Sequence, residues 1–571
     1  MNKFKLITLV LGYLFHSFSV AQSDKPYNPV TDARLLNPEP ENWLMYRGTY
    51  DSHGFSTLDQ INTDNVADLE MVWSFSTGLR EGHQAPPIVN DGMMYVSTPQ
   101  NHVLAIDAQS GNLLWRYIRY LPDDLQQFHP TNRGVALYGE RLYLATVDAV
   151  LVCLDAVTGE TLWEVTVEDY YDGYYMTMAP LIAEGKVMVG VSGGELGIRG
   201  FVAAFDSETG SQAWKTYTIP APGEPGSESW PGDSWETGGV PVWITGSYDH
   251  ELGLSYWGTG NGGPWMGDTR PGDNLYATSV IALDVETGEL ANHHQYHWND
   301  SWDWDEVAAP LLIDYARDGQ NIKGLIHAGR NGYLWFLERS QKSIGFVEAK
   351  PYVYQDVFTS IDESTGRPEY DMSKKPGTGF EASFCPSLWG GKDWPPVAFD
   401  PTSRLLFIPA NDNVCSTMVG EEVQYNPGQA FMGRGQSENG GFFIRPGTSH
   451  IGELQAWNVD TGQQAWKTTF KSHNWGPVLA TAGNLVFMGG TNDRYFRAFN
   501  SKTGDLLWEQ PTNSGVIGVP VSFAIDGKQH IAVQSGWGVD AEREQNLINM
   551  TSGSNTYVPQ GGAIWVFALP D

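Results

Sequence analysis

The chain has 571 residues and a formal net charge of −33. Such an acidic balance excludes nucleic acid as an expected partner, because binding it needs a basic patch, and by default it keeps an exported protein soluble. Sixty-four glycines, 33 prolines and an aromatic content of 13% suit many turns and large ring-lined interfaces.

Residues 1–21 are predicted to be a secretory signal. Lys3 and Lys5 give a positive start, residues 6–15 form an apolar run, and Ser19-Val20-Ala21 is a small-residue cleavage site. The apolar run is too short to span a bilayer, and no later segment is long enough. We therefore expect a mature chain, 22–571, that is exported, has no membrane span and is most simply periplasmic.

An eleven-residue phrase recurs along the mature chain. It opens on a small residue, continues through Asp or Asn to Ser/Thr-Gly, and closes on Trp. The full copies are 105–115, 153–163, 204–214, 456–466 and 498–508, ending in Trp115, Trp163, Trp214, Trp466 and Trp508; a sixth copy, 282–292, lacks the Trp. Each copy is typical of a strand, a glycine turn and a second strand.

The spacing of the copies predicts the fold. Steps of about 40–50 residues fit four-stranded blades. Two weaker copies, 336–346 and 398–408, bring the number to about eight. Strands at 69–75 and 563–569 are expected to pair and close the ring, which removes exposed edges. The sequence thus predicts an all-β, eight-bladed β-propeller over 22–571, with the tryptophans packed between blades.

Three cysteines are present. Cys385 and Cys415 flank one loop, and export permits a disulfide between them. Cys153 occupies the small position of its repeat, so we expect a buried free thiol. The sequence contains no Cys-x-x-Cys-His, so no c-type haem is expected to be covalently attached.

Two glycine-rich segments stand outside the scaffold pattern. In 192–200, Gly193 and Gly194 allow a ligand to approach the backbone and are followed by Glu195. In 257–265, Asn261 leaves a strand with an amide oxygen that suits a hard cation. The plainer alternatives are an ordinary turn in the first segment and an asparagine with left-handed backbone in the second.

Two further segments carry charge. Asp303 and Asp305 are two residues apart, so in an extended segment both carboxylates face one side, where they repel unless a cation lies between them. Neighbouring tryptophans favour this interpretation over a solvated acidic loop. Arg330 follows an apolar strand and offers a guanidinium to an anionic or carbonyl ligand, although a surface arginine is the alternative.

In this order and spacing, the segments resemble the pyrroloquinoline-quinone (PQQ) dependent alcohol dehydrogenases, eight-bladed quinoproteins that include methanol dehydrogenases. The resemblance implies that Glu195, Asn261 and Asp303 bind a metal ion that also binds PQQ. It also implies that Asp303 is the general base and that Arg330 hydrogen-bonds the reactive quinone oxygens.

The resemblance implies further cofactor and substrate contacts. Trp243 matches the ring on which PQQ lies, and Arg133 matches a partner of a PQQ carboxylate. The remaining implied residues are Thr177, Ser192, Gly193 and Gly194 around the cofactor, Trp475 and Asp393 near two further cofactor positions, and Trp265 in the substrate cavity wall. Two departures stand out: Gln84 replaces a glutamate of some members, and Gln127-Phe128 replaces a vicinal disulfide found in many.

Asp305 indicates the metal. Calcium-dependent members have a small residue there, whereas lanthanide-dependent relatives have Asp. A trivalent cation gains more from a third carboxylate than Ca²⁺ does, and it polarises the quinone C5 carbonyl more strongly. The expected cofactors are PQQ and a lanthanide ion, with Ca²⁺ as the alternative.

The expected activity is oxidation of a primary alcohol to the aldehyde. Asp303 takes the hydroxyl proton, hydride passes to PQQ C5, and a separate periplasmic cytochrome c receives the electrons. The alternatives are a Ca²⁺-dependent polyol or sugar dehydrogenase and a non-catalytic propeller scaffold of outer-membrane assembly. The alcohol, the acceptor and the oligomeric state stay open, with a homodimer as one option.

Overall fold

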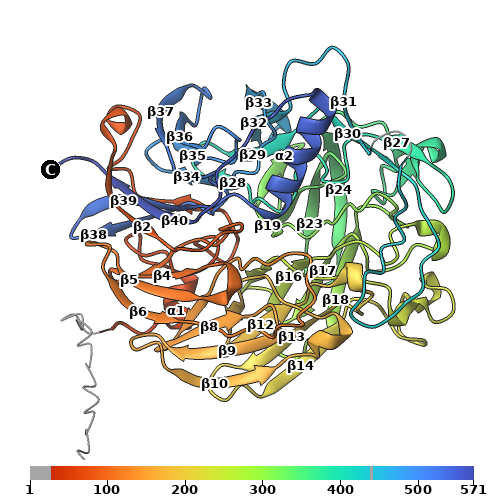
Figure 1. Ribbon diagram of the computed structural model, residues 1–571, viewed down its shortest axis with the longest axis horizontal. Coiled ribbons are helices and arrows are strands. Elements are labelled where there is room, and N and C mark those ends of the chain that lie inside the picture. The colour runs from red at the N-terminus through yellow and green to blue at the C-terminus, as the bar shows by residue number, and fades with distance from the viewer. Residues whose placement is uncertain (1–26, 438–440) are drawn as a thin grey trace, which may run out of the picture.

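A computed structural model describes residues 27–437 and 441–571, so the predicted signal at 1–21 lies outside the described residues. The described residues form eight sheets of four or five strands, arranged in a ring (Figure 1). This is the predicted all-β propeller. No helix within the described ranges is long and apolar enough to cross a membrane.

The blades follow one another along the chain. The first four are β3 (Ile88–Asn90), β4 (Met93–Ser97), β5 (Val103–Asp107), β6 (Leu113–Tyr117); β7 (Ala136–Tyr138), β8 (Arg141–Ala145), β9 (Val150–Asp155), β10 (Thr161–Thr166); β11 (Leu181–Ala183), β12 (Lys186–Gly190), β13 (Phe201–Asp206), β14 (Gln212–Tyr217); and β15 (Ser247–Asp249), β16 (Leu254–Gly258), β17 (Ser279–Asp284), β18 (Leu290–Gln295).

The next four complete the ring. They are β19 (Leu311–Leu312), β22 (Gly324–Ala328), β23 (Tyr333–Arg339), β24 (Ile344–Pro351); β28 (Ala398–Asp400), β29 (Leu405–Asn411), β32 (Gly452–Asn458), β33 (Gln463–Phe470); β34 (Val478–Thr481), β35 (Leu485–Met488), β36 (Tyr495–Asn500), β37 (Leu506–Pro511) with β1 (Phe55–Ser56) added in parallel; and β38 (Val521–Ile525), β39 (Lys528–Ser535), β40 (Ala563–Ala568), β2 (Glu70–Ser76).

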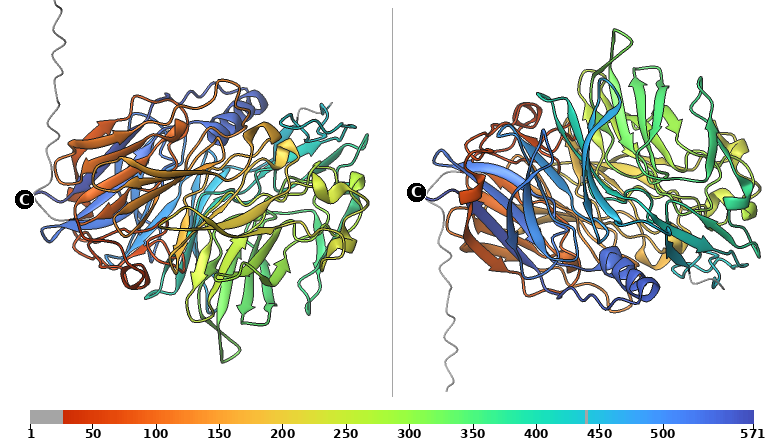
Figure 2. Two further views of the ribbon diagram at one scale, coloured as in Figure 1. Left: turned by 90° about the horizontal axis from the view of Figure 1, so that it is seen from below. Right: turned by 90° about the horizontal axis from the view of Figure 1, so that it is seen from above.

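Smaller elements decorate the blades. They are the hairpins β20 (Tyr315–Arg317) with β21 (Gln320–Ile322) and β25 (Phe358–Ile361) with β26 (Pro368–Tyr370), the sheet of β27 (Ala382–Phe384), β30 (Val414–Met418) and β31 (Phe442–Ile444), and the helices α1 (Asp32–Leu36) and α2 (Val539–Ser552). Helix α2 lies on one face of the ring (Figure 2). The predicted disulfide Cys385–Cys415 is present, and Cys153 is a buried free thiol.

The recurring phrase forms the last two strands of a blade, and its tryptophan docks on the next blade. Trp115 Nε1 donates to the carbonyl of Ala156 at 3.2 Å. Its ring covers Gly159, where an added Cβ would lie 2.6 Å from the indole and φ is +75°. The turn glycine is therefore needed twice, for its backbone conformation and for the close approach of the ring. Trp73, which lies outside the recurring phrase, docks in the same way: its Nε1 donates to the carbonyl of Ala108 at 3.0 Å.

One of the weaker copies was assigned wrongly. The segment 398–408 forms β28 and β29, the first two strands of the blade whose last two strands carry the full copy 456–466. It is therefore not a separate blade. A small residue followed by an acid and a turn also fits a first hairpin, and only the closing tryptophan distinguishes the two cases. The remaining blade is the closing one.

The ring closes between the two ends of the chain, as predicted. β2 pairs antiparallel with β40, from Glu70 opposite Ala568 to Ser76 opposite Ala563. Trp508 Nε1 reinforces the junction by donating to the carbonyl of Leu69 at 3.0 Å. β40 is therefore paired on both sides, with β39 and β2, and β2 forms the outer strand of the closing blade.

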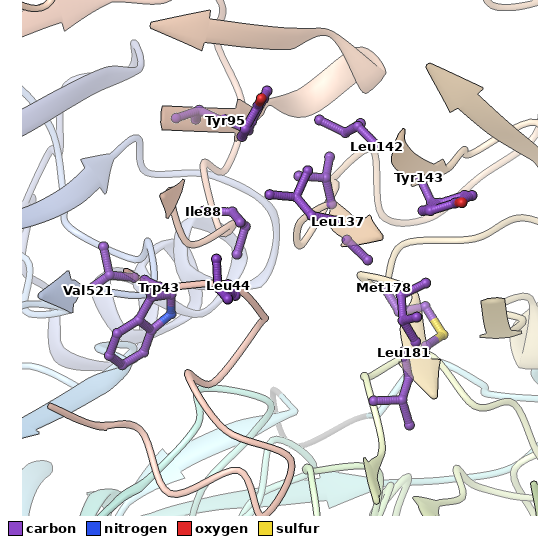
Figure 3. Close-up of a cluster of buried hydrophobic side chains, with 14 of the residues drawn as sticks. Trp43, Leu44, Ile88, Tyr95, Leu137, Leu142, Tyr143, Met178, Leu181 and Val521 are labelled. Atoms are coloured by element: carbon purple, nitrogen blue, oxygen red, sulfur yellow. The ribbon is translucent and has the colours of Figure 1, made fainter. Parts of the chain in front are cut away.

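The apolar core lies between neighbouring blades. Figure 3 shows buried side chains that meet there, among them Ile88 of the first blade, Leu137 of the second and Leu181 of the third. Sheets packed face to face in this way fix where each blade-connecting loop starts. The core therefore holds the loops on the two faces of the ring in place.

Candidate active site

The chemistry-bearing residues lie on loops at one face of the ring. Glu195 follows β12, Asn261 follows β16 and Arg330 follows β22, each the second strand of its blade. Asp303 and Asp305 lie in the connection from β18 to β19. Since every blade has the same strand order and direction, these loops converge on the same side of the propeller.

A pocket opens there. Its lining consists of His129, Arg133, Tyr175, Thr177, Ser192, Gly193, Glu195, Pro241, Trp243, Asp303, Asp305, Arg330, Trp389, Asp393 and Asp540. Ten of these belong to the set named from the sequence: Arg133, Thr177, Ser192, Gly193, Glu195, Trp243, Asp303, Asp305, Arg330 and Asp393.

Five named residues do not line the pocket. Gly194 and Asn261 lie directly behind the wall, where a Cβ on Gly194 would be 3.5 Å from Asn261 Oδ1. Trp475 is buried, donates to Glu544 Oε2 at 2.9 Å and has an edge-to-face contact with the pocket residue Trp389. Gln84 and Trp265 are buried outside the lining.

Asp303 and Asp305 form a buried carboxylate pair. Their exposures of 8% and 6% are incompatible with the solvated-loop alternative. Asn261 binds both, with Nδ2 donating to Asp303 Oδ1 at 2.9 Å and its backbone N–H donating to Asp305 Oδ1 at 2.5 Å. The other oxygen of Asp305 accepts from Trp243 Nε1 at 2.8 Å.

The electrostatics of this pair favour a cation. Burial, together with the charges of Asp305 and Glu195, raises the pKa of Asp303 well above its ordinary value. Burial also raises the pKa of Asp305 to about 6. Asn261 Oδ1 is buried with no hydrogen-bond partner among the described residues. Three carboxylates and one amide oxygen are the donor set that a hard multivalent cation prefers, so the residues fit a metal ion.

Asp300 braces the backbone that presents Asp303. Its carboxylate accepts from the N–H groups of Trp302, Asp303 and Trp304 at 3.3, 3.0 and 3.4 Å, and from His297 Nε2 at 3.1 Å. Asp303 itself adopts a left-handed φ of +65°. The brace holds this residue in a conformation that non-glycine residues seldom adopt. Asp300, part of the same acidic run, therefore has a structural role.

Arg330 and Arg133 supply positive charge to the pocket. Arg330 donates through Nη1 to the carbonyl of Asp303 at 2.7 Å and through Nη2 to Asp393 Oδ1 at 2.5 Å. Arg133 donates to Thr177 Oγ1 at 2.6 Å, with its guanidinium 4.7 Å from the Trp243 ring centroid. The Nε atoms of both arginines are buried without a partner among the described residues. A flat indole beside two such donors fits a planar polyanionic cofactor.

One wall of the pocket was not anticipated from the sequence. His129 pairs with Asp540 of α2 at 3.3 Å, and its other ring nitrogen lies 3.3 Å from the hydroxyl of Tyr175. The carbonyl of Phe128 accepts from Arg543 Nη2 of α2 at 2.6 Å. This wall occupies the side where Gln127-Phe128 departs from the family pattern. No sequence signal marked it, because an aspartate in the first turn of a polar helix is an ordinary feature.

Comparison with known proteins gives the class and then the family. Residues 43–359 and 449–531 match the PQQ family model described as "Glucose/ethanol/alcohol dehydrogenase, beta-propeller domain". This propeller is therefore the catalytic domain of a quinoprotein oxidoreductase. The chain belongs to the PQQ-dependent alcohol dehydrogenases, which excludes the scaffold alternative.

Three relatives show how close the match is. Quinoprotein alcohol dehydrogenase PedH of Pseudomonas putida is 37% identical over 90% of this chain and 89% of that protein. The lanthanide-dependent methanol dehydrogenase of Methylacidiphilum fumariolicum is 35% identical over 88% and 86%. The structure of a europium-containing methanol dehydrogenase superposes with a TM-score of 0.87 and 33% identity, covering 94% of this chain and 99% of that one.

Proposed function

We propose that this enzyme oxidises a primary alcohol to the aldehyde with PQQ and a lanthanide ion held by Glu195, Asn261, Asp303 and Asp305. The observation that carries the metal assignment is the buried carboxylate of Asp305 beside Asp303 on the pocket wall. Three carboxylates leave excess negative charge around a divalent ion but balance a trivalent one. Two similar proteins are described as lanthanide-dependent and europium-containing, which supports the proposal.

The protein residues have separable roles in this proposal. Trp243, oriented by its hydrogen bond to Asp305, offers a flat surface for the cofactor, and Arg133 pairs with an anionic group of it. When bound, PQQ supplies an electrophilic quinone that accepts a hydride, and the metal ion supplies Lewis acidity. Asp303 accepts the proton of the substrate hydroxyl, and Arg330 directs N–H groups toward developing negative charge.

The proposal extends to the cellular setting. The predicted signal at 1–21 supports export, most simply to the periplasm. We propose that the electrons leave to a separate cytochrome c, a proposal supported by the lack of Cys-x-x-Cys-His in residues 1–571. Reduction of purified periplasmic cytochrome c by the loaded enzyme in the presence of alcohol tests this step.

The metal assignment is tested with Asp305→Ala. Loaded with PQQ, the wild type is expected to turn over ethanol with La³⁺ and poorly with Ca²⁺, whereas Asp305→Ala loses La³⁺-supported turnover and keeps or gains Ca²⁺-supported turnover. Asp273→Ala is the matched control, because Asp273 is a partly exposed acid that pairs with Arg367.

Metal binding is also measured without turnover. Terbium luminescence sensitised by tryptophan is expected for the wild type, since Trp243 is hydrogen-bonded to Asp305, and is expected to weaken in Asp305→Ala. Equal wild-type activity with Ca²⁺ alone would favour the calcium-dependent alternative. Unchanged La³⁺ activity in Asp305→Ala would contradict the role of Asp305.

A further inference from the structure

The insertion between β30 and β32 places a short segment, 431–434, against the proposed site. The N–H of Phe431 donates to the carbonyl of Glu195 at 2.7 Å. The carbonyl of Met432 accepts from the N–H of Trp265 at 2.8 Å. This segment is therefore fixed by backbone hydrogen bonds to a proposed metal ligand and to the proposed wall of the substrate cavity.

Arg434, at the end of the segment, places its guanidinium beside the ring of Trp265. Its guanidinium carbon lies 5.7 Å from the centroid of the Trp265 ring, and the side chain is partly buried. The side chain of Arg434 forms no hydrogen bond and no ion pair with any of the described residues. Arg330 differs in this respect, because its side chain is bonded to Asp303 and Asp393.

Arg434 lies near enough to Asp303 for their charges to interact. Burial lowers the pKa of Arg434, and the negative charge of Asp303 opposes that change. An arginine stays protonated at neutral pH. Partial burial without a counter-ion is costly for a guanidinium, so an anion that reaches it gains a charge-assisted hydrogen bond, often bidentate.

We infer that Arg434 selects alcohols that carry a carboxylate or another anionic group at the end remote from the hydroxyl. The hydroxyl would lie at Asp303 and the anionic end against the guanidinium. This inference deepens the proposed function and rests on its assignment of Asp303 as the base. An amino group at the remote end would be repelled.

The kinetic test compares ω-hydroxycarboxylates, from glycolate to 6-hydroxyhexanoate, with 1-alkanols of the same chain lengths. The wild type is expected to favour one or more of the hydroxycarboxylates in kcat/KM, and 6-amino-1-hexanol is expected to be the poorest six-carbon substrate. Arg434→Leu is expected to raise KM for the favoured hydroxycarboxylate by about tenfold to a hundredfold, the range of one charge-assisted hydrogen bond. The KM of the matching alkanol should change less than threefold.

Two variants separate recognition from packing. Arg434→Lys keeps the charge but not the planar fork, so it is expected to retain part of the preference. Arg445→Leu is the matched control: Arg445 lies in the same insertion but stacks on Tyr354 and donates to Asn413 Oδ1 at 2.8 Å. Equal losses on both substrate series in Arg434→Leu would mean that the side chain only packs against Trp265, and would overturn the inference.

An equilibrium measurement is independent of turnover. Titration calorimetry of the metal- and PQQ-loaded enzyme with hexanoate is expected to show binding in the wild type and Arg445→Leu, and its loss in Arg434→Leu. Binding that survives Arg434→Leu would place the carboxylate elsewhere and overturn the inference.

If alcohols are oxidised but Arg434 variants discriminate between the two substrate series as the wild type does, the inference fails and the proposed function stands. If no alcohol is oxidised with any metal, the proposed function fails while calorimetry still tests Arg434.

Discussion

Asp303 shows how several weak constraints position one buried carboxylate. The Asp300 brace holds its backbone at φ +65°, Asn261 fixes one oxygen, and burial beside Asp305 disfavours its ionised form. Each neighbour restricts the side chain in a different way. The carboxylate is thus held in one position, as the proposed role of general base requires.

The first prediction is that Asp303→Asn folds but loses turnover by about 10²–10⁴-fold, the usual contribution of a general base. Asparagine has the same shape and tolerates left-handed backbone well, so the loop should keep its conformation. Steady-state turnover of the PQQ- and La³⁺-loaded variant measures the loss, and the PQQ absorption band reports whether the cofactor still binds. Retention of more than about a tenth of wild-type turnover would rule out the base role.

At the residue scale, short-range patterns could be predicted from the sequence, whereas long-range contacts could not. The spacing of Asp303 and Asp305 indicated a shared direction, and both line one pocket. The pairing of His129 with Asp540 joins a loop near the start of the chain to a helix near its end. Nothing in the local sequence of either residue specifies the other, because the ring brings them together only after every blade has formed.

At the element scale, the tryptophan phrase was the most reliable signal because it combines a turn requirement with a packing requirement. Where the tryptophan is absent, as in 398–408, the remaining pattern also fits the first hairpin of a blade. Helix α2 was not anticipated, because Val539–Ser552 carries no continuous apolar stripe. Polar contacts hold it instead, including Trp475 Nε1 to Glu544 Oε2.

The second prediction concerns Glu544 in α2. Burial, with the negative charges of Asp393 and Asp540, raises the pKa of this carboxyl well above its ordinary value. The folded state therefore binds the proton more tightly than the unfolded state, and this stabilisation is lost as pH rises above the unfolded pKa of about 4.3.

Glu544→Gln keeps an oxygen for Trp475 and removes the titration. Its free energy of unfolding is expected to depend less on pH than that of the wild type, by up to ~1.4 kcal/mol per pH unit above pH 4.5. Urea denaturation across pH 4.5–8 measures the difference. Parallel pH profiles for the two proteins would show that Glu544 ionises freely in the folded state.

The third prediction concerns the disulfide that joins Cys385 to Cys415 across 30 positions of sequence. Replacing both residues by Ser is expected to lower the free energy of unfolding by roughly 3–4 kcal/mol, through the greater entropy of the open loop in the unfolded chain. Thermal unfolding of the oxidised wild type and the double variant measures this. Cys153→Ser serves as a control for loss of a thiol without loss of a crosslink. An unchanged melting temperature in the double variant would contradict the prediction.

At the scale of the whole molecule, the repeat spacing predicted a closed ring, and the pairing of β2 with β40 completes it. Closure was predictable because an open propeller would leave two unpaired edges. The dimensions of the pocket could not be predicted, because they depend on insertions such as 416–450 that follow no repeat. One of these insertions holds Phe431, whose N–H donates to the carbonyl of Glu195 at 2.7 Å.

The fourth prediction is that deletion of residues 563–571 destabilises the entire ring. Without β40, both β2 and β39 lose their central partner, so we expect a lower melting temperature and concentration-dependent aggregation. Deletion of Pro570 and Asp571 alone, which leaves β40 intact, is the control. Thermal unfolding and light scattering measure both variants. A truncated protein that melts and scatters like the control would show that the ring does not depend on this junction.

The same junction determines when the ring can close as the chain is synthesised. β2 is among the first strands to be synthesised, yet its partner β40 ends at Ala568, three residues before the last residue of the sequence. β2 must therefore wait until residues 563–568 have been synthesised before its hydrogen bonds with β40 can form. Until then the closing blade has no outer strand, so the ring of the newly made chain stays open.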